Sequence, residues 1–463
     1  MSLIQEKSVH DHAATRTGEP TAPPIGTSRR GPSALLTLLT AAGGPRYATA
    51  LLVDAVGTGL LRPFLLLYGI EVLHLTAGAA GLAMTLGMVV GLLVVPLTGR
   101  WIDRGARTRP AAATLAARSV GALALLAAGG LPGFTAAAVL IGVGSQSWPA
   151  THAAVVSTLT EGRLRDAALA AGRSLRNAGL GAGALLATVA VTGGEGAIRL
   201  LAGVTGVACL GAAALVHSLR VTAPPVAAPT DTPQAGPRTP MRRITLLSLA
   251  NVPYAFCFDV LEVALPALLV LHLQTSPAWS SGVFVGNTVL VIALQLALVL
   301  RLAHRPRRVV MAAAGFALAL SFLGFWAAGS LGGTPGAAGI AVVAVLFTLG
   351  EILYTGSGTA LVAAVAPPHL LGRALARWEL SMGVGRAAAP AVLTALLSAG
   401  PGVLWSTLAV ATLAGAVAVL RLGPAEWVTP GPAPATALGM RAGRRAPILG
   451  ATPARPEEGP SAR

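Results

Sequence analysis

About twelve long apolar runs constrain this chain more than any other feature of its sequence. A helix needs about 20 mostly apolar residues to span the hydrocarbon core of a bilayer, and the runs are of that length. We therefore expect an all-α integral membrane protein with twelve transmembrane helices. Their expected positions are 47–70, 77–98, 110–130, 134–156, 168–192, 197–218, 244–272, 281–301, 309–329, 337–365, 376–399 and 402–422.

The composition agrees with a chain whose bulk lies in lipid. Hydrophobic residues make up 54% of the 463 positions and charged residues 11%, with a mean hydropathy of +0.72. A soluble domain carries about 25% charged residues, so this chain has too few to cover a water-exposed surface. The net charge of +16 does not indicate nucleic-acid binding, because the basic residues form short clusters between apolar runs.

Basic and nearly uncharged connections alternate along the chain. Arginines cluster at 100–109, 163–165, 220–243, 301–308 and 373–377, whereas turns such as 131–133 and 399–402 carry none. Basic loops lie on the cytoplasmic side of a membrane protein. We therefore expect a multi-pass protein of the cytoplasmic membrane with both termini in the cytoplasm.

One polar, Pro-rich stretch divides the predicted helices into two sets of six. The stretch 220–243 is expected to be a cytoplasmic linker between an N-terminal half at 46–219 and a C-terminal half at 244–422. Two six-helix halves around a midplane site are typical of transporters. Residues 1–45 and 423–463 are expected to be disordered cytoplasmic tails.

Motifs for enzymatic or metal chemistry are absent from the sequence. The two cysteines, Cys209 and Cys257, lie inside apolar runs and do not form a disulfide framework or metal site. There is no phosphate-binding Gly-Lys-Ser/Thr loop, zinc-binding His-Glu-x-x-His or Gly-x-Ser-x-Gly elbow. We expect no cofactor, no metal and no enzymatic activity. The expected partners are a small-molecule substrate, protons and membrane lipid, and not nucleic acid, and we expect the protein to be a monomer.

The segment Gly99-Arg-Trp-Ile-Asp103-Arg104-Gly-Ala-Arg107 lies between the second and third predicted helices. It resembles the loop signature Gly-x-x-x-Asp-Arg-x-Gly-Arg of the major facilitator superfamily, departing from it at Ala106. The resemblance covers about residues 47–422 and implies alternating access between two six-helix halves. It also implies that Gly99, Asp103, Arg104 and Arg107 form a latch that favours the outward-facing state. The alternative is that these arginines only determine topology.

Ionisable side chains inside the membrane are costly and mark functional sites. The predicted first helix carries Asp54, Thr58 and Arg62, the seventh carries Asp259 and Glu262, and the tenth carries Glu351. The hypothesis is that Asp259, Glu262 and Glu351 couple transport to protons, with Arg62 as their switching cation and Asp54 as a further candidate. The alternatives are a static ion pair of Arg62 with one acid, and a structural role for Asp54 with Arg118 as partner.

Polar and aromatic residues on the helices that line the family's cavity are candidates for substrate contact. They are Thr58, Gln146, Trp148, His152, Asn251, Tyr254 and Thr355, with Arg386, Asn287 and Gln295 as second-tier candidates. The alternative is that the aromatic residues of this set are core residues, which pack between helices and do not contact substrate. His152 is either a proton relay or an interfacial histidine.

The resemblance to efflux-type members, together with few hydrogen-bonding groups in the predicted cavity, favours proton-coupled export of a small amphipathic drug or secondary metabolite. The alternatives are proton-coupled uptake of a small solute and a non-transporting membrane scaffold or sensor. The sequence departs from many drug antiporters at Ala138, where they carry an arginine, and it lacks their Gly-Pro signature on helix five.

Overall fold

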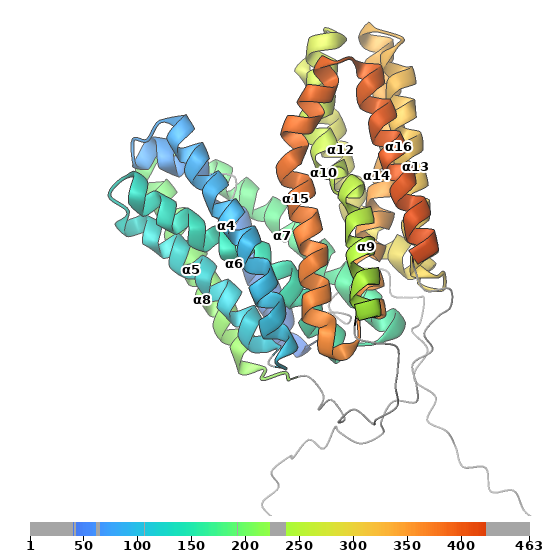
Figure 1. The fold of residues 1–463 in the computed structure, drawn as a ribbon. Helices are drawn as coiled ribbons and strands as arrows, with labels where there is room; N and C mark the ends of the chain where they lie inside the picture. Colours follow the sequence, from blue (N-terminus) through green and yellow to red (C-terminus); the bar gives the residue numbers. More distant parts are fainter. Residues whose placement is uncertain are drawn as a thin grey trace, which may run out of the picture. The chain divides into compact units, whose positions relative to one another are not determined.

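The computed structural model describes residues 40, 43–61, 65–105, 107–191, 193–222 and 238–422, and all statements below concern these residues. They are overwhelmingly helical and contain no β-strand (Figure 1). The helices before residue 223 are called the first group and those after residue 237 the second group. Arg62, Ala106, most of the expected N-terminal tail, residues 223–237 of the expected linker and the expected C-terminal tail lie outside the described residues.

The first group contains long helices joined by short turns. The first expected run is divided into α2, α3 and η2, with residues 62–64 outside the description. The bounds are α2 Gly44–Leu61, α3 Leu65–Leu67, η2 Tyr68–Val72, α4 Ala77–Asp103, α5 Thr108–Ala127, α6 Leu131–Leu159, α7 Gly162–Val191 and α8 Gly194–Ser218.

The second group begins with a segmented helix and continues with long ones. Its first apolar run is built from α9 Arg238–Ala255, α10 Cys257–Asp259, η3 Val260–Ala264, α11 Leu265–Ala267 and η4 Leu268–His272. The remaining elements are α12 Pro277–Leu302, α13 Arg307–Gly329, α14 Gly333–Val365, η5 Pro368–Leu370, α15 Leu371–Ser398 and α16 Pro401–Leu422.

Each expected apolar run overlaps a described helix over most of its length, but not every helix is apolar enough to identify as a membrane span. By length and composition, nine helices of the described residues qualify, or ten if the bent pair Gly44–Leu61 and Leu65–Val72 is one span. α6 and α7 are long, at 29 and 30 residues, yet are not among the nine. Both carry polar side chains in their middle turns, which lower their hydropathy.

Small residues allow neighbouring helices to approach closely. A Cβ on Gly87 of α4 or Gly142 of α6 would collide with the backbone of the other helix. Likewise, a Cβ on Gly179 of α7 would lie 2.5 Å from the Cβ of Ala55 on α2. Close packing at small residues is a main source of helix association in lipid.

Aromatic side chains fill much of the second group's core. Phe322 and Phe325 of α13 pack against Phe347 of α14 and Trp405 of α16, with ring centroids 5.3–6.1 Å apart. These rings are nearly or fully buried. The core therefore lies between the helices, while leucines and valines such as Leu82 and Val342 remain exposed, as lipid-facing positions require.

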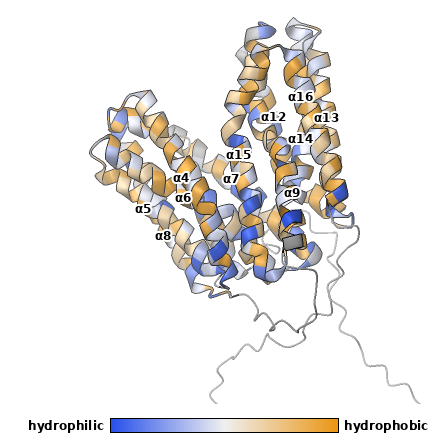
Figure 2. Ribbon diagram, viewed as in Figure 1, coloured by the Kyte–Doolittle hydropathy of each residue, from blue (hydrophilic) through white to orange (hydrophobic). Residues whose placement is uncertain are grey.

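The two groups also contact each other. α4 packs along α15, and α7 packs along α12. Figure 2 shows hydrophobic residues along the helices and hydrophilic residues concentrated at one end, where the loops after α4 and before α15 lie. That end carries the basic loops to which the sequence assigns a cytoplasmic position.

Candidate functional site

Three carboxylates approach one another inside the second group. Asp259 ends α10, Glu262 lies in the widened turn η3, and Glu351 lies in the middle of α14. Both Asp259 and Glu351 interact electrostatically with Glu262. Such widened turns are rare and are frequent at functional sites, because they change the direction of the side chains that follow. The structure brings the three acids into one region, where Asp259 is buried and Glu262 is exposed.

The cation that faces this cluster is Arg386 on α15. Its Nε lies 4.0 Å from Asp259 Oδ2, and its guanidinium carbon lies 5.3 Å from the ring centroid of Phe258. Asp259 Oδ2 is buried and has no hydrogen-bond partner among the described residues. Arg62, which the sequence analysis assigned to this role, lies outside those residues. The ion pair between Arg386 and Asp259 is long, and the Asp259 carboxylate is left without a full set of hydrogen bonds from the described residues.

Glu351 is held by a polar pair between α12 and α14. The hydroxyl of Thr348 lies 2.6 Å from Asn287 Oδ1, and Asn287 in turn hydrogen-bonds the Glu351 carboxylate. Thr355, one turn further along α14, donates to the carbonyl of Ile352 within its own helix at 3.2 Å. The second-tier candidate Asn287 thus belongs to the cluster.

Asp54 belongs to a separate buried ion pair in the first group. Its Oδ1 lies 2.6 Å from Arg118 Nη2, and both side chains are about 95% buried. The same guanidinium donates to the hydroxyl of Thr58, which itself donates to the Asp54 carbonyl at 2.7 Å. The pairing with Arg118 that the structural interpretation expects is present. Buried pairs of this kind become strongly destabilising when one member is removed.

His152 and Trp148 lie in the wall of a small cavity of about 80 Å³. His152 Nδ1 is 2.7 Å from the Tyr47 hydroxyl, and its ring packs against Tyr47 and Trp148 at 5.9 and 5.8 Å. Gln146 lies one turn before Pro149 on α6, and its Cγ faces Gly91 of α4. These contacts are those of core residues, as the alternative interpretation of the aromatic side chains expects.

The sequence analysis missed Glu379, which lines the same cavity from α15. Glu379 interacts electrostatically with Arg173 and Arg176 of α7, and Arg173 donates to Thr359 of α14 at 3.4 Å. The cavity therefore joins both groups through charged side chains. An isolated glutamate within a predicted span, 376–399, was a signal that could have identified it.

Asn251 and Tyr254 are fully buried within the second group. Asn251 donates to Ser381 and accepts from the Tyr354 hydroxyl, both at 2.9 Å. Tyr254 donates to the Met311 carbonyl at 3.1 Å. These satisfied contacts assign them to the packing of α9 against its neighbours in this structure.

Asp103, one of the residues of the predicted latch, joins the two groups at their basic ends. Asp103 accepts from the backbone N–H of Gly372 at 2.6 Å and from Arg373 Nε at 2.8 Å. A carboxylate is stabilised at the start of a helix, here α15, by the helix dipole. Gly99 permits this approach, because a Cβ there would lie 2.7 Å from the Gly372 carbonyl oxygen.

The two arginines of the latch motif differ from each other. Arg107 is buried and donates to the carbonyls of Ile102 at 2.6 Å and Pro368 at 3.4 Å. Its pKa is lowered, first by burial, against the opposing effect of Asp103. Arg104 is exposed, and its side chain has no hydrogen bond or ion pair within the described ranges.

A second contact between the groups was not predicted. Asp166 of α7 pairs with Arg307 of α13, whose Nε lies 2.9 Å from Asp166 Oδ2 and whose Nη2 donates to Gly162 O at 3.2 Å. The loop before α13 lacks the aspartate that the loop after α4 carries. Here the carboxylate comes instead from the first group. A lone aspartate at the start of an apolar helix was the only sequence signal.

Comparison with known proteins gives a family. The family model described as Major Facilitator Superfamily matches residues 47–350. No curated protein sequence matches this chain. Among solved structures, the human organic anion transporter MFSD10 (TETRAN) superposes with a TM-score of 0.63 at 15% identity, covering 84% of this chain and 100% of its own.

Two further structures show the same fold. A bacterial homologue of the iron transporter ferroportin, in an outward-facing state, gives a TM-score of 0.66 at 14% identity, covering 81% of this chain and 98% of its own. The E. coli fucose:proton symporter FucP gives 0.58 at 13% identity, with coverage of 82% and 98%. At these identities the likeness establishes the fold alone.

Proposed function

This chain belongs to the Major Facilitator Superfamily, and the solved structures that resemble it are transporters. We propose that it is a secondary active transporter that works by alternating access. In this proposal α6 and α7 span the membrane as well, which gives twelve spans in two six-helix halves. The termini and the basic loops lie in the cytoplasm of a cell whose plasma membrane holds the protein.

The observation that carries the proposal is the carboxylate cluster of Asp259, Glu262 and Glu351. Within the described residues, one arginine, Arg386, faces these acids, and its contact with Asp259 is 4.0 Å long. Asp259 is buried and Glu351 is partly buried, whereas Glu262 is exposed. Arg386 alone cannot neutralise both Asp259 and Glu351, and an unneutralised charge in a low-dielectric interior is costly. Protons therefore supply the remaining neutralisation, which makes the cluster a coupling site.

Coupling follows if the cluster has different water access in the two states of the transporter. In the state described here, polar contacts at the basic ends hold the groups together through Asp103 and Asp166. We assign this state to the closed cytoplasmic side, with the cluster exchanging protons with the outside. Breaking both contacts gives the cluster cytoplasmic access and lets protons leave inward.

The preferred direction is export of a small amphipathic compound in exchange for protons. The polar side chains of the first group that were candidates for substrate contact are engaged in packing, which leaves mainly apolar surface for a substrate. Uptake with protons uses the same carboxylates in the opposite substrate direction, and the experiment below separates the two.

The test uses inside-out vesicles that hold a respiration-driven pH gradient, read by a pH-sensitive dye. Compounds from a panel of lipophilic cations and neutral antibiotics are added to wild type, Glu351→Gln and Asp259→Asn. Export predicts compound-dependent collapse of the gradient in wild type and its loss in either variant. A wild-type response that persists in both variants refutes the coupling site, and uptake in right-side-out vesicles refutes the direction.

A further inference from the structure

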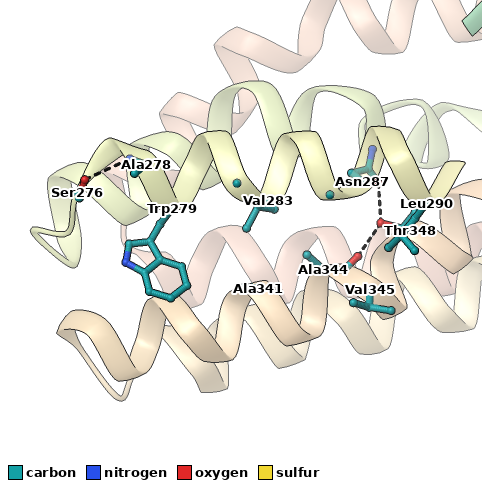
Figure 3. A pocket seen from close by; sticks show the side chains of 12 residues that line it. Ser276, Ala278, Trp279, Val283, Asn287, Leu290, Ala341, Ala344, Val345 and Thr348 are labelled. Atoms are coloured by element: carbon teal, nitrogen blue, oxygen red, sulfur yellow. Dashed lines mark hydrogen bonds between the residues drawn. The ribbon is translucent and has the colours of Figure 1, made fainter. Parts of the chain in front are cut away.

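A groove of about 320 Å³ lies between α12 and α14, and we call it the α12–α14 groove. Figure 3 shows Trp279 at one end and the hydrogen bond between Asn287 and Thr348 at the other. Val283 and Ala344 contribute to the apolar wall between them. Its volume lies at the lower end of the range of about 300–1,000 Å³ that is typical of small-molecule pockets.

Two glycines create this space without being needed for helix packing. Gly282 and Gly286 of α12 line the groove, and a Cβ at either position would have no atom within 4 Å. By contrast, a Cβ at Gly356, where α14 meets α12 closely, would lie 2.6 Å from Val299. The missing side chains at Gly282 and Gly286 therefore leave an unfilled volume.

The polar end of the groove leads to negative charge. Asn287 lines the groove and hydrogen-bonds Glu351, and Glu262 interacts with Glu351 electrostatically. Among the described residues, the charged groups that interact in this region are three acids, Asp259, Glu262 and Glu351, and one base, Arg386. Formal charge is thus negative when the acids are ionised.

We propose that the α12–α14 groove binds the apolar body of a lipophilic organic cation, whose positive charge is balanced by Glu351 through the Asn287 end. The apolar wall accommodates the body, and the Trp279 ring offers a face for an aromatic or cationic group. A cation in an apolar site needs an opposite charge, which the acids supply, whereas an anion would meet like charge. This proposal rests on the transporter function above and names its substrate class.

The groove also explains how substrate and protons compete. A bound cation and a proton neutralise the same carboxylate, so the two cannot both occupy Glu351. Exchange of one organic cation for protons follows from this shared neutralisation.

The experiment measures equilibrium binding of radiolabelled tetraphenylphosphonium to the full-length protein in lipid nanodiscs. Tetraphenylborate, which has nearly the same shape and the opposite charge, is the competitor. We expect saturable binding that unlabelled tetraphenylphosphonium displaces and tetraphenylborate does not. Gly286→Leu, which fills the groove, and Glu351→Gln, which removes its charge, should each weaken binding at least 10-fold.

Matched controls separate filling of the groove from damage to the fold. Gly211 of α8 also has no atom within 4 Å of a Cβ, so Gly211→Leu adds the same side chain away from the groove and should leave binding unchanged. Gly282→Leu should reproduce the effect of Gly286→Leu. Melting temperatures of all variants should agree with wild type.

Unchanged affinity in both groove-filling variants overturns the groove as the binding site, and equal competition by tetraphenylborate overturns the cation as substrate class. These results leave the transporter proposal standing if compound-driven proton movement still depends on Glu351. Absence of tetraphenylphosphonium binding refutes the substrate class, whereas absence of proton movement with every compound refutes coupled transport itself.

Discussion

The contact of Asp103 with the start of α15 should control how often the cytoplasmic side opens. Replacement of Asp103 by Asn retains the shape of the side chain and one acceptor oxygen but removes its charge. The variant should shift the protein toward states in which α4 and α15 separate at their basic ends.

The size of this shift toward the open state follows from the separate contacts of Asp103. The bond from the Gly372 N–H, at 2.6 Å, is charge-assisted, and such bonds are worth about 1.5–3 kcal/mol against about 1 for neutral ones. The helix dipole adds about 0.3–1 kcal/mol. Arg373 is 47% exposed, so its ion pair adds little. A total loss of about 2 kcal/mol lowers the ratio of closed to open protein about 30-fold.

Spin labels on exposed residues of the two groups measure this ratio. Arg109→Cys and His304→Cys place labels on exposed residues in the first turn of α5 and on the connection before α13. Double electron–electron resonance in nanodiscs should show a longer-distance population that grows in Asp103→Asn. Glu195→Gln is the control, because Glu195 and Arg199 form an exposed pair within α8, 3.9 Å apart.

The reasoning is refuted if the distance distribution of Asp103→Asn equals that of the control. It is also refuted if the added population has a shorter distance, because the contact would then oppose closure. A similar growth in Arg373→Ala would show that the exposed ion pair, and not the buried backbone bond, carries the contact.

Three further predictions concern buried polar groups. Asp166→Asn should increase the open population at the basic ends of the groups. The double exchange Asp166→Arg with Arg307→Asp should recover part of the closed population in the same distance measurement. No recovery would argue against a direct pair. Asp54→Asn leaves the Arg118 charge buried, so the free energy of unfolding should fall by about 3–5 kcal/mol, measured as a lower melting temperature, and an unchanged value would contradict the static role. Gln295 is fully buried and neither amide atom has a hydrogen-bond partner in the described part of the chain, so Gln295→Leu should raise the melting temperature; a loss of stability would show that the amide is satisfied by a bound group.

The helices were predictable because hydropathy reports them directly. Each expected run coincides with described helix to within a few residues, and most helices begin earlier because polar first turns, such as that of α7 at Gly162, extend beyond the apolar stretch. The division of the seventh run into α9–η4 was not predictable. Polar residues and prolines interrupt this run at several positions, and they do not indicate where the widened turn at Val260–Ala264 forms, because that depends on how the chain packs.

The candidate site was predictable only in part. Asp259, Glu262 and Glu351 are identified because ionisable residues within predicted membrane spans mark candidate functional sites, and this criterion needs only their positions in the sequence. It cannot choose their partners, since Arg386 and Asn287 come from helices far along the chain. The same limit explains why the Asp166–Arg307 contact, which spans 141 residues, was missed.

Among the described residues, the two ion pairs that join the groups at their basic ends have the same polarity, whereas the interaction of Glu379 with Arg173 and Arg176 has the opposite one. Both carboxylates, Asp103 and Asp166, come from the first group, and both arginines, Arg373 and Arg307, come from the second. Two copies of the first group would place acid against acid at these positions, and two copies of the second would place arginine against arginine. The pattern therefore disfavours homotypic pairing of separately synthesised groups and directs assembly toward the mixed pair, a form of specificity achieved by repulsion of the wrong partner.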